Sequence, residues 1–350
     1  MTEALATVRY VEDFKNHGFS FCGKAPVAVH YIRIGGLVLK LIFLEEKAIA
    51  SVMPALQHLA CDPSDDVSLT VTIGGRQTSA ELLLQSPWRE EIEACRDKIL
   101  MVNADSFHMQ YNPDSTIYSL IDMEAKKAFY FANHFDAVPY YEHSAPLKFI
   151  LHWWCEHQGF CLVHAAAVGV RDAGVLLVGR GGSGKSTTAV SAAVHGLKYA
   201  GDDYVVLSHQ SVPSALSIYC SGKINADVLA GLPVLQPHIV NPDRQATDKA
   251  LVFLGNPFRS VWTGGIRLKA IVATKITGGK AALRKSSPTL VFAEIASSTI
   301  FQMPGSGART LAALKLAFQA LPVYTLELDT DFTENVRMLK DFCLDSGDER

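Results

Sequence analysis

The octapeptide Gly179-Arg-Gly-Gly-Ser-Gly-Lys-Ser186 has the most specific chemical meaning in this sequence, because it fits the pattern G-x-x-x-x-G-K-[ST] without a mismatch. Glycines allow successive backbone N–H groups to turn toward one anion, and the start of a helix adds about half a positive charge directed at it. The lysine of such a loop reaches the β and γ phosphates of a nucleotide, and the serine hydroxyl binds Mg²⁺. The octapeptide therefore predicts a phosphate-binding loop.

The segments on both sides of the octapeptide agree with this prediction. Residues 174–178 are apolar and predict a buried strand, and residues 184–195 predict a helix that begins within the loop. The alternative is a glycine-rich turn that binds nothing, and the complete pattern in this context weighs against it. Lys185 is expected at the phosphates, Ser186 at Mg²⁺, and the Arg180 side chain in solvent. The residues expected to bind the nucleotide are Gly179, Arg180, Gly181, Gly182, Ser183, Gly184, Lys185, Ser186 and Thr187.

An acidic pair, Asp202-Asp203, begins 17 residues after Lys185. One helix and one short strand fill that interval, so we expect the pair at the C-terminal end of a strand beside the loop strand. That edge is where open α/β sheets bind ligands. Mg²⁺ needs a carboxylate there, and phosphoryl transfer to an alcohol needs a base, so two adjacent acids can divide these roles. The alternative is an Asp-Asp turn without a chemical role.

His164 precedes Lys185 by 21 residues, in an apolar run from Cys161 to Val170 that predicts one strand. If this strand lies beside the loop strand, His164 can face the acidic pair. A single histidine in an apolar strand is more often a core residue, and the spacing alone favours that interpretation.

Three segments together resemble bacterial HPr kinase/phosphorylase and the wider group of HPr-kinase-related proteins. They are His164-Ala-Ala-Ala-Val168, the loop of residues 179–186, and Tyr199-Ala-Gly-Asp-Asp-Tyr204. In that family a histidine, a phosphate loop and an Asp-Asp pair occur in this order and at similar spacing. The resemblance implies an α/β phosphate-loop kinase domain akin to phosphoenolpyruvate carboxykinase. It also implies ATP, Mg²⁺ and a serine as phosphoryl acceptor.

The resemblance also implies roles for individual residues. Carried over by position, Asp202 is the catalytic base, Asp203 is the acid on the magnesium side with Ser186, and His164 is the hydrogen-bonded neighbour of the two aspartates. Lys185 completes the catalytic set. HPr kinases assemble, so the resemblance leaves a homo-oligomer open.

The sequence departs from the family in the segment after the acidic pair. HPr-recognising enzymes carry Leu-Glu-Ile-Arg-Gly there, whereas residues 216–225 read Leu-Ser-Ile-Tyr-Cys-Ser-Gly-Lys-Ile-Asn. HPr itself and the reverse phosphorolysis reaction are therefore not predicted. By analogy the chain is nearer to kinases found beside peptide-modification gene clusters, which act on a serine of a precursor peptide. The predicted acceptor is a protein or peptide serine, or a small-molecule alcohol.

A cation is usually needed near a transferring phosphoryl group to neutralise its charge. For each candidate a solvated surface charge is the commoner interpretation, and the sequence does not choose among them. The candidates are Lys223, Arg259, Arg267 and Arg309.

These motifs lie in the second of two expected domains. Residues 1–142 predict a β-rich α+β domain that binds a substrate or partner, with two strands around a Gly-Gly turn in Tyr31–Phe43 and an alternating strand at Val67–Ile73. Helices are expected at Ala48–Leu59, where Pro54 weakens the pattern, and at Glu90–Lys98. Residues 143–350 predict the kinase domain, after a proline-containing linker.

Composition narrows the class of protein. The 350 residues carry a net charge of −3, which argues against a nucleic-acid binder. Seven cysteines without any CxxC spacing indicate neither a zinc ribbon nor a disulfide framework. The longest apolar stretch, residues 145–170, is interrupted by charged residues and histidines, so no membrane segment is expected. We predict a cytoplasmic protein.

The sequence thus predicts an ATP- and Mg²⁺-dependent kinase with a serine-type acceptor. No N/T-K-x-D guanine motif and no LSGGQ motif is present, which argues against a GTPase and an ABC-type ATPase. Two alternatives stay open at this point. One is a nucleotide switch or ATPase that transfers phosphate only to water, and the other is a peptide-binding module with a vestigial nucleotide site.

Overall fold

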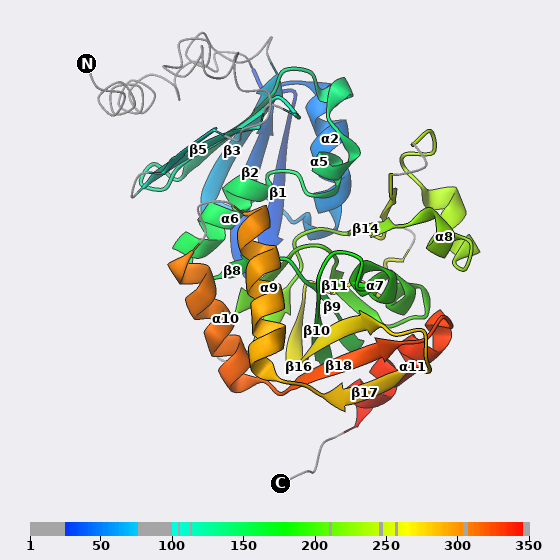
Figure 1. The fold of residues 1–350 in the computed structure, drawn as a ribbon. Coiled ribbons are helices and arrows are strands. Elements are labelled where there is room, and N and C mark those ends of the chain that lie inside the picture. Colours follow the sequence, from blue (N-terminus) through cyan, green and yellow to red (C-terminus); the bar gives the residue numbers. More distant parts are fainter. Residues whose placement is uncertain are drawn as a thin grey trace. The chain divides into compact units, whose positions relative to one another are not determined.

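The computed structural model describes residues 25–75, 100–103, 106–112, 114–209, 212–244, 248–255, 258–303 and 307–345 of the chain (Figure 1). The chain divides into two compact units, residues 1–154 and 155–350. The sequence places the boundary before helix α6 (Lys148–His157), whereas the compact units divide within that helix.

The first unit is built on a seven-stranded sheet in the order β1-β2-β3-β7-β6-β5-β4. The pairs β2–β3 and β3–β7 are parallel, and the other pairs are antiparallel. The predicted Gly-Gly turn joins β1 and β2, and Gly35 and Gly36 both have positive φ. The strands are β1 (Ala28–Ile34), β2 (Leu37–Phe43), β3 (Leu69–Gly75), β4 (Leu100–Asn103), β5 (Phe107–Asn112), β6 (Ile117–Asp122) and β7 (Lys127–Ala132).

The helices of the first unit are short. The predicted helix near Ala48 is α2 (Glu46–Leu56), which contains Pro54 in its last turn and continues into the 3-10 helix η2 (Gln57–Leu59). Pro54 has no N–H to donate to the Ala50 carbonyl, so α2 lacks one i→i−4 hydrogen bond in its last turn. The predicted helix Glu90–Lys98 lies outside the described residues. The other helical segments among the described residues of this unit, before α6, are η3 (Phe135–Ala137) and α5 (Tyr140–Ser144).

The second unit is built on a nine-stranded mixed sheet whose main path is β11-β9-β10-β16-β13-β12-β8, with β18 and β17 added beyond β16. The pairs β10–β16 and β16–β18 are parallel. A separate pair, β14 (Ser221–Ile224) and β15 (Ala250–Phe253), is antiparallel. The strands of the large sheet are β8 (Cys161–Val163), β9 (Ala166–Val170), β10 (Ala173–Val178), β11 (Lys198–Gly201), β12 (Val205–Ser208), β13 (Ser214–Leu216), β16 (Gly265–Ile276), β17 (Ala282–Lys285) and β18 (Val323–Leu328).

The prediction of one strand from Cys161 to Val170 is wrong. The run is two strands, β8 and β9, because β8 pairs with β12 while β9 pairs with β10 and β11. His164 and Ala165 lie in the break between them, where the Ala165 N–H donates to the Val163 carbonyl at 3.0 Å. An unbroken apolar run hides such a break, since both strands are buried on both faces.

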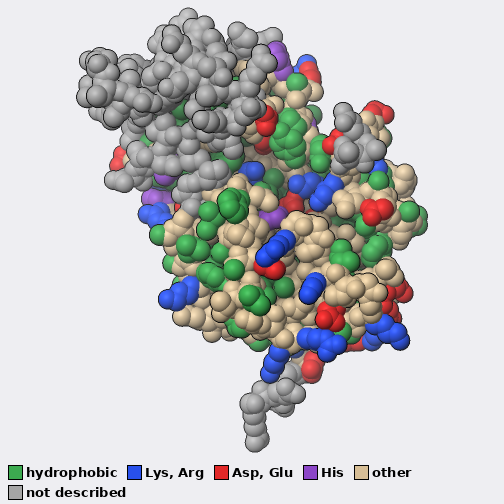
Figure 2. Space-filling model, viewed as in Figure 1, with side chains coloured by type: hydrophobic (Ala, Val, Ile, Leu, Met, Phe, Trp, Pro, Cys, Tyr) green, Lys and Arg blue, Asp and Glu red, His purple; other side chains and the backbone are tan. Residues whose placement is uncertain are grey.

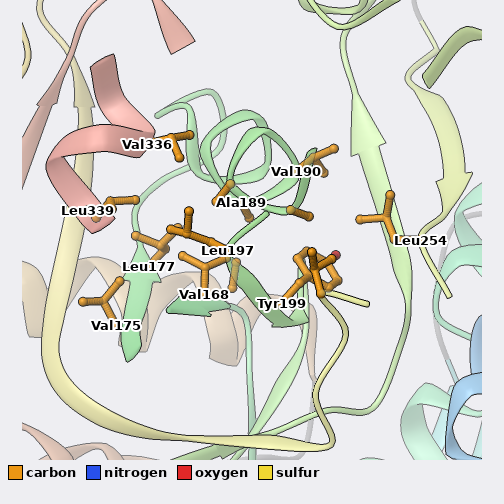
Figure 3. Packing of buried hydrophobic residues seen from close by; sticks show 14 of the residues in the cluster. Val168, Val175, Leu177, Ala189, Val190, Leu197, Tyr199, Leu254, Val336 and Leu339 are labelled. Carbon is orange, nitrogen blue, oxygen red and sulfur yellow. The ribbon is translucent and has the colours of Figure 1, made fainter. Parts of the chain in front are cut away.

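Helices cover both faces of this sheet (Figure 1). Alternate residues of β10 point to opposite faces, so Val175 and Leu177 pack with one pair of helices, and Leu176 and Val178 pack with the other. The first pair is α7 (Lys185–Val194) and α11 (Phe332–Leu344), and Figure 3 shows the apolar cluster beneath it. The second pair is α9 (Pro288–Gln302) and α10 (Ala308–Ala320). Because β10 packs against helices on both faces, the end of β10 and the start of α7 are held in place.

Two short helical segments, α8 (Ala226–Leu229) and η4 (Pro233–His238), lie between β14 and β15 in the sequence. Among the described residues, no helix combines the length and the apolar character needed to cross a bilayer.

Candidate nucleotide site

The glycine-rich loop, residues 179–184, connects the end of β10 to the start of α7, as the sequence predicts. Gly184 is the residue before α7 and has φ 91°, and Gly179 has φ 149°. Both values lie in the region that favours glycine. Space is also limited, because a Cβ atom on Gly184 would lie 2.3 Å from the Leu328 Cδ1 atom. The Ser183 hydroxyl lies 2.9 Å from the Thr274 hydroxyl of β16, which ties the loop to the sheet.

A cavity of about 310 Å³ opens beside this loop. Of the residues that the sequence predicts for the site, the cavity brings together His164, Asp203 and the loop from Arg180 to Thr187. Gly179 and Asp202 are not among its lining residues. The structure adds residues that the sequence reasoning did not place at the site, namely Asn225, Asp227, Val228, Lys249, Ile276 and Gln302, and it places Lys223 in the lining.

The acidic pair follows β11 directly and precedes β12. Asp203 has φ 62°, an uncommon value for a residue other than glycine, and the Tyr204 N–H donates to the Asp202 carbonyl at 2.8 Å. The two neighbouring side chains therefore occupy different environments. Asp203 lines the cavity, whereas Asp202 is 1% exposed and buried behind it.

Lys185, the first residue of α7, is buried between the two acids. Its Nζ atom is 3.8 Å from Asp202 Oδ1 and 3.9 Å from Asp203 Oδ1. The Nζ atom of Lys223, on β14, pairs with Asp203 Oδ2. Two lysines and two aspartates thus balance one another in a place where isolated charges would be costly.

The two aspartates differ in proton affinity. Burial raises the pKa of Asp202, and the charge of Lys185 opposes this shift. Burial would also raise the pKa of Asp203, but Lys223, His164 and Lys185 together hold it well below its ordinary value. Asp203 is therefore the firmly ionised member of the pair.

His164 enters this charged group from the break between β8 and β9. Its Nε2 atom is 3.7 Å from Asp203 Oδ1 and 3.4 Å from Lys185 Nζ. Burial lowers the pKa of His164, and Lys185 adds to this effect, while Asp203 opposes it. As the sequence predicts, His164 lies beside the acidic pair, and its Nε2 atom faces Asp203.

The four candidate cations are not equivalent. Lys223 lines the cavity and pairs with Asp203. In the described part of the chain, Arg259, Arg267 and Arg309 are not among the lining residues. Arg180 is at the rim, where its side chain is 80% exposed and lies 3.7 Å from Glu294 of α9.

The residues present fit a magnesium nucleotide. The described residues include no cluster of three or more His, Cys, Asp or Glu side chains suited to hold a metal alone. Mg²⁺ bound with a nucleotide needs fewer protein ligands, because phosphates and waters supply the remainder. Both carboxylate oxygens of Asp202 are buried without a hydrogen bond of ordinary geometry among the described residues, and the Ser186 hydroxyl and Asp203 line the adjoining cavity.

Comparison with known proteins gives little more. No family model matches the chain. No curated protein sequence matches it either. Among solved structures, it is similar to the HPr(Ser) kinase/phosphatase from Coxiella burnetii, with 10% identity and a TM-score of 0.28 over 49% of this chain and 88% of that chain. A likeness of that extent does not place the chain in a family.

Proposed function

We propose that the protein is an ATP- and Mg²⁺-dependent kinase that transfers the γ-phosphoryl group to a serine-type hydroxyl. The observation that carries the proposal is the position of Lys185. Its ammonium group lies within 4 Å of both aspartates, beside a glycine-rich loop that lines the same cavity as Asp203. Phosphate binding, charge neutralisation and an acid–base group are thereby available within one cavity.

The loop and Lys185 hold the phosphates in this proposal. Backbone N–H groups of residues 179–184 and the start of α7 favour an anion. Lys185 has the two aspartates as counterions, so its charge is already directed at the place where phosphate oxygens would enter. Lys223 is the cation that we assign to the transferring phosphoryl group, because of the four candidates it alone is among the described lining residues.

Ser186 and Asp203 would hold Mg²⁺, which when bound supplies positive charge to the phosphate oxygens. Asp202 is proposed as the base that accepts the hydroxyl proton, by position in the family resemblance. Because Asp203 lines the cavity and Asp202 does not, the reverse division has support from geometry. Both aspartates are therefore substituted in the test below.

A specific observation favours a polypeptide acceptor over a small alcohol. Exposed apolar side chains gather over α9 and α10 in Figure 2. The exposed apolar residues of these two helices include Leu290, Phe301, Leu311 and Leu316. Phe301 is 84% exposed and directly precedes Gln302, which lines the cavity. An apolar surface on the helix whose last residue lines the cavity suits an extended or helical peptide segment around the acceptor serine.

The test uses γ-labelled ATP with Mg²⁺, a library of serine-containing peptides and a cell extract. We expect label on a polypeptide from the wild-type protein, and none above background from Lys185→Ala or from the variant that lacks the base, Asp202→Asn or Asp203→Asn. Phe301→Ser should raise the KM for the peptide and leave the KM for ATP unchanged. Release of all label as free phosphate would instead support an ATPase, and absence of ATP binding would support a binding module.

A further inference from the structure

The last turn of α9 holds His164 at two points. The backbone N–H of His164 donates to the Thr299 hydroxyl at 3.1 Å, and the amide nitrogen of Gln302 lies 3.2 Å from His164 Nδ1. These contacts matter because His164 lies in the break between β8 and β9, where sheet pairing does not hold it. Thr299 and Gln302 are three residues apart and therefore share a face of the helix.

Gln302 is in turn oriented by Tyr204, the residue after the acidic pair. The Tyr204 hydroxyl donates to the Gln302 side-chain oxygen. With its oxygen engaged in this way, the Gln302 amide presents its NH₂ group to His164 Nδ1, which must then accept a hydrogen bond. Tyr204 is 5% exposed, and its ring centroid is 5.8 Å from that of His164. The ring of Tyr204 therefore packs near the ring of His164 while its hydroxyl bonds to Gln302.

The Gln302 amide nitrogen also lies 3.5 Å from His164 Nε2, so its closer contact is the one with Nδ1. The Nε2 atom has two further neighbours with opposite requirements. Asp203 Oδ1, at 3.7 Å, is an acceptor and favours a proton on Nε2. Lys185 Nζ, at 3.4 Å, is a donor and favours a bare Nε2. Lys185 and Asp203 therefore do not settle where the proton of a neutral His164 resides, and the closer approach of the Gln302 amide to Nδ1 favours a proton on Nε2.

We propose that Gln302, oriented by Tyr204, is a positioning residue that keeps the proton of His164 on Nε2, facing Asp203. In this arrangement the Nε2–H group of His164 is directed at Asp203 Oδ1, 3.7 Å away, and Lys185 stays directed at the carboxylates and at an incoming phosphate. The consequence for catalysis rests on the proposed function. The location of the proton does not, because it is a property of the protein without nucleotide.

The tautomer can be observed directly by NMR of the full chain labelled with ¹⁵N-histidine, without nucleotide and at a pH where His164 is neutral. His164→Gln identifies the His164 signals among those of the other histidines. We expect Nδ1 to be unprotonated and Nε2 protonated in the wild-type protein. Gln302→Met keeps the length of the side chain and removes the NH₂ donor, so both tautomers should become populated. Gln302→Glu places an acceptor beside Nδ1 and should move the proton there.

Two further variants keep the test decisive. Gln319→Met makes the same change at an exposed position of α10 and should leave the His164 signals unchanged. Tyr204→Phe removes only the hydroxyl that orients Gln302, so it should give both tautomers even if Gln302→Met does not fold. A wild-type protein with the proton on Nδ1, or signals unchanged in both Gln302→Met and Tyr204→Phe, would overturn the proposal.

If phosphoryl transfer is detected, the same variants give a second readout. We expect Gln302→Met and Gln302→Glu to lower kcat with the KM for ATP unchanged, in the order of their tautomer shifts. If the tautomers shift as expected but no transfer is found, the kinase proposal fails and the positioning role of Gln302 stands. If transfer is found and the tautomers do not shift, the positioning role fails alone.

Discussion

Positive side chains line both the site cavity and a second hollow in the described part of the second unit, and the two places differ in how exposed these charges are. The site cavity of about 310 Å³ is lined by Lys185, which is buried, and by Asp203, whose side chain is 14% exposed, while Asp202 is buried behind it. The far hollow, lined by residues 170–173, 212, 267–269 and 343–345, is larger, about 560 Å³. Its arginines, Arg171 and Arg267, are exposed, and Lys269 donates to the backbone carbonyls of Phe342 and Asp345.

This comparison shows that the burial of charge, and not the size of a hollow, distinguishes a candidate site. An exposed arginine keeps its hydration and costs the fold little. Burying a lysine with two carboxylates costs desolvation free energy. Such a cluster of buried charges is typical of a site where a ligand interacts with them. At the far hollow, water solvates the two exposed arginines, and the backbone carbonyls at the end of α11 accept hydrogen bonds from Lys269.

The largest expected effect comes from removing the buried lysine. Lys185→Ala should lower the rate of phosphoryl transfer by roughly 100- to 1,000-fold or more, because a preorganised cation directed at the transferring group is lost. The matched change Lys269→Ala, at the far hollow, should leave the rate unchanged. Single-turnover transfer assays measure both, and equal losses in the two variants would refute the distinction between the hollows.

The loop glycine gives the next largest effect. Gly184→Ala should lower the free energy of unfolding by about 1–3 kcal/mol, because φ is 91° and the new Cβ would meet Leu328. Gly278→Ala is the control, since Gly278 has φ 73° and open space around it. We expect a smaller loss there and normal ATP binding. Chemical denaturation gives both free energies, and equal losses would show that the contact with Leu328 relaxes freely.

Asp202→Asn should abolish phosphoryl transfer if Asp202 is the base. It should also raise the free energy of unfolding by roughly 1 kcal/mol, since active sites often trade stability for activity. The pKa of Asp202 is raised in the folded protein above 3.8, so the carboxylate is more stable when protonated there. Its contribution to stability is thus lost as the pH rises through the folded pKa. Without Mg²⁺, the advantage of Asn should therefore be small below pH 3.8 and grow above it. Urea titrations measure the free energy of unfolding of both proteins at each pH. A stability advantage of Asp202→Asn that shrinks as the pH rises would contradict the account.

The smallest effect is expected at the rim of the far hollow. Arg267→Ala should change the free energy of unfolding by less than about 0.5 kcal/mol, because its side chain is exposed. Thermal and chemical denaturation measure this. A larger change would indicate that charge at this hollow has a structural role that its exposure does not reveal.

The sequence predicts the local parts of the site well. The loop, the strand before it and the helix after it are adjacent in the chain, so glycine spacing and apolar runs suffice, and α7 is found within one residue of the predicted helix at each end. The break between β8 and β9 could not be predicted, because it depends on which strands each half pairs with. Gln302 could not be predicted either. It lies 138 residues from His164 along the chain, and only the packing of α9 brings them together.

Lys223 illustrates a middle case. The sequence offers it as one of four equal candidates, since any Lys or Arg in a loop or strand end can be a surface charge. Only the pairing of β14 with β15 and the position of Asp203 distinguish it from the three arginines. Local pattern therefore predicts the glycine-rich loop, while non-local strand pairing and helix packing determine which side chains lie beside it.

Calorimetric titration of ATP into the wild-type protein, Lys185→Ala and Arg267→Ala, each with and without Mg²⁺, tests the central claim most directly. The account predicts one ATP per wild-type chain, with tighter binding in Mg²⁺, loss of binding in Lys185→Ala and unchanged binding in Arg267→Ala. Absence of ATP binding to the wild-type chain, or binding that survives Lys185→Ala and is lost in Arg267→Ala, would contradict it.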